Sequence, residues 1–290
     1  MRPRGWEAWA MDIVLGVSIA PASVQMVMLQ GENADGPTID ENEFPITGAD
    51  DSPTVSASDR VITAIMCTRE DAAGAGLELD SIGVACTDQL EAAVLRDALA
   101  AHTIENVMLV SAFLAATALT QFVGGAMGYE RTAVLFVEPD TATLAVVETS
   151  DGSVDDVHEE RLEAGPTVTA ELMQLVAGLE ELPTPTGGVF VVGAGVDVTA
   201  IRQRLEQTTS LTVNVPEEPE TALARGAALA SAHAHASSTT ALAYAQDPGT
   251  GAVDVSALPE YLSVDDAGPG TDDLAYSAVA DDEADAATSF

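Results

Sequence analysis

The fold is decided by a stretch of sequence that occurs twice, first as Val14–Val24 (VLGVSIAPASV) and again as Val134–Leu144 (VLFVEPDTATL). Each copy has an apolar run, a short segment typical of a tight turn, and a second apolar run that continues to Leu29 or to Val147. Apolar runs separated by a turn predict a β-hairpin. All positions shift by 120 residues between the copies (134 − 14), so the pattern indicates a duplicated unit.

The segments after each hairpin also correspond, because each half continues as strand, helix, strand and helix. The expected elements are Ile82–Cys86, Asp88 to about Ala101, Val107–Val110 and Ala112–Gly124 in the first half, and Val189–Val192, Thr199–Gln207, Leu211–Val215 and Glu218–Ala232 in the second. Thr87 is placed to cap the first of these helices, whose apolar positions Leu90, Val94, Leu95, Ala98 and Leu99 recur at helical spacing. Val154–Leu162 is expected to add a strand to the second sheet.

Strands that alternate with crossover helices predict an α/β fold of two lobes, each with a mixed, mainly parallel sheet. We assign lobe I to residues 11–129 and lobe II to residues 130–236, with the two hairpin turns facing each other across a cleft. The uncharged stretch Val107–Tyr129 is interpreted as a strand and helix of the core, because its interior is rich in small and polar residues, rather than as a membrane span.

Both ends of the chain differ from this pattern. Residues 1–10 lack a signal-peptide pattern, and because Met11 begins a much better start they are interpreted either as an N-terminal extension or as a mis-called start. Residues 237–290 contain no base and are rich in Asp, Ala, Gly, Ser and Pro, which predicts a disordered acidic tail. Tyr244, Tyr261 and Tyr276 in this tail are either docking points for a partner or remnants of drifted sequence.

The charge balance excludes several classes of function. The chain has 47 acidic residues against 10 basic ones, a net charge of −37, and every base is an arginine. Without lysine there is no Walker lysine and no Schiff base. Phosphate contacts need clustered bases, so neither nucleic acid nor anionic membranes are expected as partners. The acidity fits either solubility and adaptation to salt, or a specific cationic partner.

No metal site is expected. The acidic clusters at Asp50-Asp51, Asp155-Asp156 and Asp281–Asp285 lack the alternating loop that calcium requires. The two cysteines, Cys67 and Cys86, lack metal-ligand spacing and stand in apolar surroundings, which predicts buried thiols rather than a disulfide.

The doubled plan resembles the actin-like ATPase superfamily, and in detail the nucleotide-binding domain of DnaK-type chaperones. The segment Val191–Gly195 looks like the adenosine motif of these chaperones, and Glu218–Ala228 (EPETALARGAA) looks like their "NPDEAVARGAA" helix. The chain is also similar to acidic DnaK-like proteins of high-GC bacteria, in which a low-complexity tail follows the domain. The resemblance implies two RNase H-like lobes and a cleft for Mg-ATP between them.

The same resemblance implies that the phosphate-binding turns are degenerate. In the first turn, the family's acid position is Ser18, its glycine position is Ala20, and its hydroxyl positions are Pro21 and Ala22. Proline also removes an amide donor. In the second turn, which should read acid, any residue, three glycines and threonine, only Glu138 and Thr143 survive.

Asp140 places a negative charge where a phosphate would lie. Two like charges about 4 Å apart repel by roughly 4 kcal/mol at an effective dielectric constant of 20. The adenosine motif keeps Gly193 and Gly195, but its base-stacking arginine aligns with Asp197.

We therefore expect a pseudo-ATPase that serves as a protein-interaction or regulatory module, with no required cofactor. A protein partner is expected, with the acidic tail as one docking arm. The alternative is a weak Mg-ATP-binding ATPase or nucleotide sensor, with Glu138 and Thr143 as catalytic candidates. The degenerate nucleotide cleft then comprises Ser18, Ser23, Glu138, Thr141, Thr143, Gly193, Ala194 and Gly195. We expect a cytoplasmic protein, held at the inner face of the membrane if a longer form carries an anchor.

Overall fold

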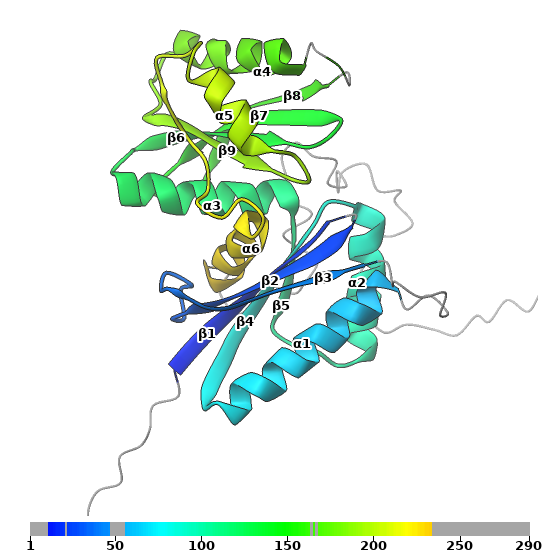
Figure 1. Cartoon of the computed structure of the whole chain (residues 1–290). Coiled ribbons are helices and arrows are strands. Elements are labelled where there is room, and N and C mark those ends of the chain that lie inside the picture. Colours follow the sequence, from blue (N-terminus) through cyan, green and yellow to red (C-terminus); the bar gives the residue numbers. More distant parts are fainter. Residues whose placement is uncertain (1–10, 21, 47–55, 163–164, 166–167, 234–290) are drawn as a thin grey trace, which may run out of the picture. The chain divides into compact units, whose positions relative to one another are not determined.

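The computed structural model describes residues 11–20, 22–46, 56–162, 165 and 168–233 (Figure 1). All of these belong to one compact unit, Met1–Val255, while a second unit, Ser256–Phe290, lies outside the described residues. The predictions for the N-terminal extension, the disordered tail and its tyrosines therefore also lie outside them.

Each half of the chain forms the same eight elements in the same order. The first half comprises β1 (Met11–Ile19), β2 (Ser23–Gln30), β3 (Thr38–Pro45), α1 (Ala57–Gly74), β4 (Leu77–Cys86), α2 (Gln89–Ala101), β5 (Val107–Ser111) and α3 (Ala112–Met127). The second comprises β6 (Arg131–Val137), β7 (Thr141–Glu148), β8 (Val154–Arg161), α4 (Val168–Ala177), β9 (Gly188–Gly193), α5 (Val198–Leu205), β10 (Thr212–Asn214) and α6 (Ala222–His233), with a 3₁₀ turn at Gly178–Glu181 after α4.

The two sheets have matching topologies. Sheet I has the strand order β3-β2-β1-β4-β5, and sheet II, read in the same sense, has the order β8-β7-β6-β9-β10. In each sheet the first three strands pair antiparallel, and the hairpin's first strand then begins a parallel run. This topology confirms the predicted α/β fold of two duplicated RNase H-like lobes, which is the actin-like ATPase fold. The sheets are mixed, as expected, but they are not mainly parallel, because each has two antiparallel and two parallel pairings.

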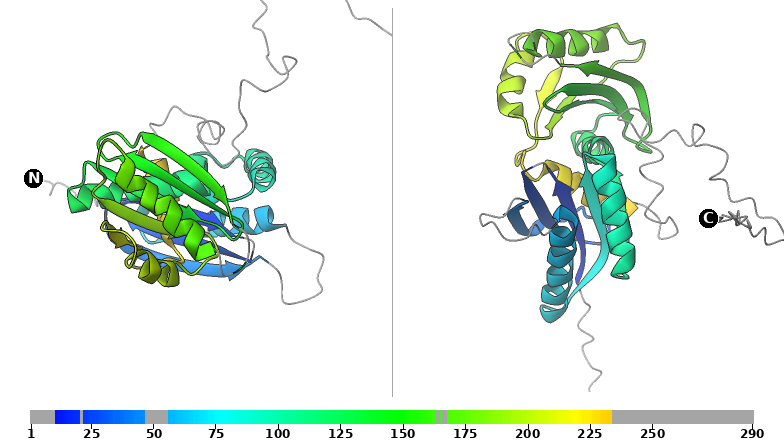
Figure 2. Two further views of the ribbon diagram at one scale, coloured as in Figure 1. Left: turned by 90° about the horizontal axis from the view of Figure 1, so that it is seen from above. Right: turned by 90° about the vertical axis from the view of Figure 1, so that its right-hand side faces the viewer.

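One face of each sheet is covered by helices of its own half. In lobe I, α1 and α2 cover one face of the sheet (Figure 2). The core beneath them includes Leu15, Val17, Ile65 and Leu95. In lobe II, α4 and α5 cover the matching face, where Leu135 and Val191 meet Leu172 and Leu205. These helices bury apolar stripes, and such burial provides most of the stability of an amphipathic helix.

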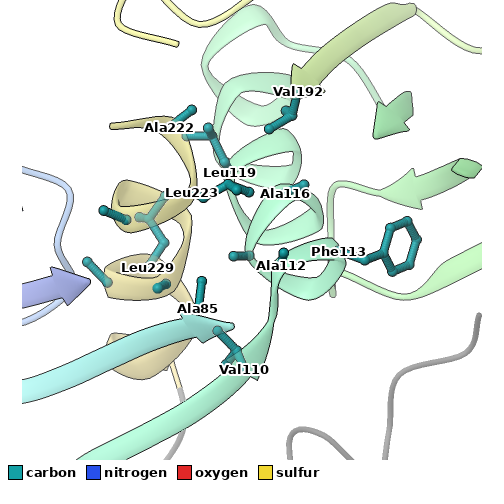
Figure 3. Close-up of a cluster of buried hydrophobic side chains, with 14 of the residues drawn as sticks. Ala85, Val110, Ala112, Phe113, Ala116, Leu119, Val192, Ala222, Leu223 and Leu229 are labelled. Carbon is teal, nitrogen blue, oxygen red and sulfur yellow. The ribbon is translucent and has the colours of Figure 1, made fainter. Parts of the chain in front are cut away.

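The last helix of each half packs on the other half. Helix α6 contacts β1 and β4 of sheet I, and α3 contacts β6 and β7 of sheet II as well as α6. The side chains between these elements form one continuous core cluster, which includes Ala116, Leu119, Leu223 and Leu229 (Figure 3). We call the sheet faces that carry α3 and α6 the inter-lobe faces.

Several sequence-based expectations need correction. The carboxylate of Asp88, rather than Thr87, caps α2 by accepting from the amides of Leu90 and Glu91 at 2.6 and 3.2 Å. Leu90 and Val94 fit the helical spacing but lie exposed on α2. Helix α6 begins at Ala222 rather than Glu218, because proline disfavours helical backbone at the residue before it and Pro219 follows Glu218 directly.

The two cysteines do not form a disulfide, as expected, but only Cys86 is buried, whereas Cys67 is exposed on α1. Val107–Tyr129 forms β5 and α3, as expected. Within the described ranges, no helix is both long and apolar enough to cross a bilayer. The elements that went unpredicted are β3, α1 and α4, in segments for which the sequence predicted no helix or strand.

Candidate functional site

The first hairpin turn lies at the end of β1 on sheet I. Ser18 is buried and shares a face with Gly16, which lies against the α6 backbone, so its side chain is on the inter-lobe face. Ser23 begins β2, and its carbonyl accepts from the amide of Ala20 at 3.0 Å. The described part of this turn thus contains neither a carboxylate nor a glycine, the two residue types that would hold hydrated Mg²⁺ and admit a phosphate.

The second hairpin turn, between β6 and β7, is closed by its own hydrogen bonds. The amide of Glu138 donates to the carbonyl of Thr141 at 2.8 Å, and the Thr141 hydroxyl donates to Glu138 Oε2 at 3.1 Å. The carbonyl of Asp140 accepts from the amide of Leu162 at 2.8 Å. The surviving carboxylate of this turn therefore has a role in holding the turn together.

The strand beside this turn adds more negative charge. In the antiparallel register of β7 and β8, Thr143 is paired with Glu159, Ala142 with Glu160, and Thr141 with Arg161. Thr143 is almost fully buried, with 1% of its surface exposed. Successive side chains of a strand lie on opposite faces, so Glu159 and Arg161 share the face of Thr143 and Glu160 does not. One arginine therefore accompanies Glu138, Asp140 and Glu159, which is unfavourable for a triphosphate.

The third predicted segment, Gly193–Gly195, joins the second turn. Val137 pairs with Gly193, and the amide of Ala194 donates to the Val137 carbonyl at 2.9 Å. A Cβ atom at Gly193 would lie 2.6 Å from Val198 Cγ1 and 2.7 Å from Val196 Cγ2, so a side chain there would clash. Gly195 has φ +71°, which L residues rarely adopt. Both glycines are thus required by the local fold.

The N-terminus of α5, which follows this segment, is occupied by a carboxylate from the chain itself. Asp197 Oδ1 accepts from the amides of Thr199 and Ala200 at 3.0 and 3.3 Å. An N-terminal carboxylate satisfies amides that lack helical partners and complements the helix dipole. The residue at the predicted base-stacking position therefore serves as a helix cap.

The structure brings together only part of the predicted site. Glu138, Thr141, Thr143 and Gly193–Gly195 gather at one end of sheet II, while Ser18 and Ser23 lie at the matching end of sheet I. Among the described residues, no group of three or more His, Cys, Asp and Glu side chains is arranged to hold a metal ion.

Sequence reasoning missed a cavity of about 440 Å³. Five elements and the segment before α6 contribute its lining, which is apolar at Leu119, Phe122, Val123, Phe190, Val215, Pro216 and Ala222, and polar at Thr38, Asn214, Glu217, Glu218, Thr221 and Arg225. Thr38 pairs with Leu29, which pairs with Val14, so the cavity adjoins the end of sheet I opposite to the first hairpin turn. No sequence motif predicts it, because its residues come together only through the packing of the two lobes.

Charged groups from both lobes meet beside this cavity. Glu41 of β3 lies near Glu218, close enough for the two carboxyl groups to interact. Partial burial raises the pKa of Glu41, the neighbouring Glu218 raises it further, and Arg225 opposes the shift. Arg225 Nη1 also donates to Thr38 Oγ1 at 3.4 Å. The cavity, which is lined about equally by apolar and polar residues, lies within the range of about 300–1,000 Å³ that is usual for a ligand site.

The chain shows likenesses to several solved structures. It is similar to the activator of the 2-hydroxyisocaproyl-CoA dehydratase from Clostridium difficile with bound ADPNP (10% identity, TM-score 0.49, 76% of this chain and 94% of the other). It is similar to the ethanolamine utilization protein EutJ from Carboxydothermus hydrogenoformans (18% identity, TM-score 0.46, 75% of this chain and 89% of the other). It is also similar to the ROK hexokinase from Thermus thermophilus (13% identity, TM-score 0.48, 75% of this chain and 97% of the other). These identities and TM-scores assign no activity to the chain.

By sequence, no curated protein matches the chain. A family model described as "Family of unknown function (DUF7159)" matches residues 12–242, which include every helix and strand named above except the first residue of β1, Met11.

Proposed function

The chain belongs to the DUF7159 family, and we propose that it uses its actin-like ATPase fold as a protein-interaction module that needs no ATP hydrolysis. The observation that carries this proposal is the second hairpin turn. Its surviving carboxylate, Glu138, is hydrogen-bonded to Thr141 within the turn, and Asp140 lies between them in a segment that should present glycines to a phosphate.

The retained glycines support the same conclusion. Gly193 is needed because Val196 and Val198 fill the space around it, and Gly195 is needed for its positive φ. Gly226 is needed because a Cβ atom there would overlap the carbonyl oxygen of Ala115 on α3. Each is a glycine that an ATP-binding relative would also keep, yet each is explained by packing or backbone conformation alone.

The DnaK-type part of the resemblance belongs to this proposal. It rests on Val191–Gly195 and on the segment Glu218–Ala228, which leads into α6. Arg225 of α6 donates a hydrogen bond to Thr38 of lobe I. In this reading α6 has kept its architectural role while the nucleotide site has degenerated. A protein partner, with the acidic tail as a docking arm, then takes the place of nucleotide as the ligand.

The second candidate function is a weak Mg-ATP-binding ATPase or nucleotide sensor. It is favoured by two hydroxyls, since Ser18 and Thr143 are both buried at matching ends of the two sheets. In that case Glu138 would hold the water around Mg²⁺ and Thr143 would contact phosphate.

Calorimetric titration of the full chain with Mg-ATP, together with a phosphate-release assay, tests the proposal. We expect neither binding heat nor turnover above buffer. Binding that is lost in Glu138→Gln and weakened in Thr143→Val would contradict the proposal and establish the second candidate. Asp156→Asn, an acid away from the turn, is the control for a general loss of charge.

The interaction half of the proposal needs a separate measurement. Affinity capture from the native host with the full chain should yield a partner that resists washing with Mg-ATP, and capture with a chain ending at residue 236 measures the contribution of the tail. A partner released by Mg-ATP would show that nucleotide controls the interaction and would contradict nucleotide independence.

A further inference from the structure

One side of the cavity beside α6 is apolar and partly open to solvent. Leu119, Phe122 and Val123 of α3 contribute to this side, together with Phe190 of β9. Leu119 lies where α3 packs against α6 (Figure 3). Leu119 and Phe190 are buried, whereas Phe122 is 36% exposed. A ring that stays accessible in a concave site offers surface that the apolar group of a ligand can cover.

The edge strand of sheet II adds a polar group to this apolar side. Asn214 of β10 pairs with Phe190, so the two side chains lie on the same face of the sheet. Asn214 is half-buried, and no hydrogen bond joins its side-chain amide to another described residue. The amide can therefore donate to a ligand in the cavity or accept from it.

The segment before α6 makes another side of the cavity acidic. Glu217 and Glu218 line it and are both exposed, and Glu41 of β3 lies near Glu218. Arg225 is the one base among the described residues of the lining. Burial and the neighbouring Glu218 raise the pKa of Glu41 although Arg225 opposes the shift, so the acids still repel each other. A cation bound among these carboxylates would relieve that repulsion.

The arginine is already engaged by the protein. Arg225 Nη1 donates to Thr38 Oγ1 at 3.4 Å, and its charge acts on Glu41. A carboxylate ligand that approached Arg225 would also meet Glu217 and Glu218, so the charge of the lining favours a cation over an anion.

We propose that the cavity beside α6 binds a small amphipathic amine, with its apolar group against Phe122 and Leu119 and its ammonium group against Glu217 and Glu218. An ammonium group donates to carboxylates in charge-assisted hydrogen bonds, which are stronger than neutral ones. The volume of about 440 Å³ lies in the range usual for small-molecule sites.

Such a ligand would contact both lobes. Leu119 and Phe122 belong to lobe I, whereas Phe190 and Glu217 belong to lobe II, so binding would stabilise the packing of the two halves. The cavity adjoins the end of sheet I opposite to the first hairpin turn, so the inference does not rest on the loss of nucleotide binding.

Calorimetric titration of the full chain with three probes that share one apolar group tests the proposal. Naphthylethylamine, naphthylethanol and naphthylpropanoate carry an ammonium, a hydroxyl and a carboxylate group at the same place. At neutral pH we expect the amine to bind at least about tenfold more tightly than the alcohol, because hydrogen bonds to charged groups are worth that factor or more. The carboxylate should bind most weakly of the three.

Variants of the lining locate the site. Glu217→Gln/Glu218→Gln should reduce the affinity for the amine to that for the alcohol and leave the affinity for the alcohol unchanged. The control, Glu70→Gln/Glu105→Gln, removes the same two charges at exposed positions outside the lining and should keep the preference for the amine. Phe122→Ala should weaken the binding of the amine and the alcohol alike. Circular dichroism melts verify that all variants remain folded.

Four outcomes would overturn the proposal. An amine that does not bind the natural chain would show that the cavity does not take this class of ligand. Equal affinity for the amine and the alcohol would show that the acids do not contribute. An amine preference that survives Glu217→Gln/Glu218→Gln would place the ligand elsewhere. Tightest binding of the carboxylate would assign the cavity to anionic ligands held by Arg225.

Discussion

The two inter-lobe faces reach the same architecture with opposite distributions of large and small residues. On sheet I the small residues are on the strands. At Gly16 and Gly83 the α6 carbonyls of Ala224 and Ala227 come so close that no Cβ atom would fit. On sheet II the strand carries a large side chain, since Phe136 occupies the position equivalent to Gly16. Its ring contacts that of Phe113 on α3 edge to face, with ring centroids 6.3 Å apart.

The small residue on the second face belongs to the helix. A Cβ atom at Gly124 of α3 would lie 2.5 Å from Thr132 Oγ1 of β6. The duplicated halves have therefore kept strand order and register, while the glycines that permit close packing have changed sides. Topology is shared between the lobes, but side-chain packing is particular to each, so a substitution tolerated on one face is expected to fail on the other.

The largest effect should follow from adding volume to sheet I. In Gly83→Val the new side chain overlaps the backbone of α6, which must move, and we expect a loss of at least about 4 kcal/mol in the free energy of unfolding, a large part of the total. Urea denaturation followed by circular dichroism measures it. The control is Gly125→Ala on α3, where a Cβ atom meets only Thr149 Cγ2 at 3.4 Å, and a gain of about 0.5–1 kcal/mol is expected from helix propensity. Equal stability of Gly83→Val and the natural chain would show that α6 does not pack closely on sheet I.

A somewhat smaller effect should follow from removing volume on sheet II. Phe136→Ala deletes a ring that is 1% exposed and leaves Phe113 without its partner, so we expect a loss of about 3–4 kcal/mol. Phe113→Ala should cost a similar amount, and the double variant should cost less than the sum because the two rings share one interaction. Additive losses in this cycle would show that the rings do not interact.

Much of this fold could be predicted from the sequence, and the reasons are local. The hairpins of β1–β2 and β6–β7 are continuous apolar runs around turn residues, so both their existence and their equivalence are visible. Strand β3 (Thr38–Pro45) went unpredicted because it is an edge strand, largely exposed, in which five of the eight residues are polar or charged. Helix α1 went unpredicted for a related reason, since charged residues interrupt its apolar positions.

The sequence predicted where the residues of the candidate site lie along the strands, but not which contacts their side chains make. The turns stand at equivalent places, as expected, because they follow from strand order. The sequence did not indicate that Thr141 bonds Glu138, that Asp197 caps α5 or that Val196 and Val198 fill the space beside Gly193, because these are tertiary contacts. The cavity beside α6 was invisible for the same reason, since its lining comes from residues as far apart in sequence as Thr38 and Arg225.

The caps of the equivalent helices α2 and α5 provide a matched test of what the lobes still share. Asp88→Ala and Asp197→Ala each remove a carboxylate that accepts from two helical amides, so each should lower the free energy of unfolding by about 1 kcal/mol. Thr87→Ala, the position favoured by sequence alone, should change it by less than about 0.5 kcal/mol. Thermal melts at fixed pH measure all three, and a larger loss for Thr87→Ala than for Asp88→Ala would contradict the observed cap.

A smaller effect should appear in the pH dependence of stability. Partial burial and the adjacent Glu218 raise the pKa of Glu41 in the folded protein above its value in the unfolded chain. Between these two values the folded protein binds more protons than the unfolded chain, so this group's contribution makes stability fall as pH rises through the window. Glu218→Gln should flatten that slope, and Glu217→Gln is the control. Urea midpoints across the acidic range measure it, and an unchanged slope in Glu218→Gln would exclude the pair as its source.

The two hairpin turns lie at matching ends of the two sheets, and we propose that they no longer bind nucleotide. The most direct measurement is the melting temperature of the full chain with millimolar Mg-ATP, Mg-ADP or AMP against buffer with magnesium alone. A ligand at about a hundred times its dissociation constant stabilises a fold by about 2.7 kcal/mol, which is a shift of a few degrees for a domain of this size. We predict no shift with any of the three nucleotides; a shift that is present in the natural chain and absent in Glu138→Gln would contradict the proposal.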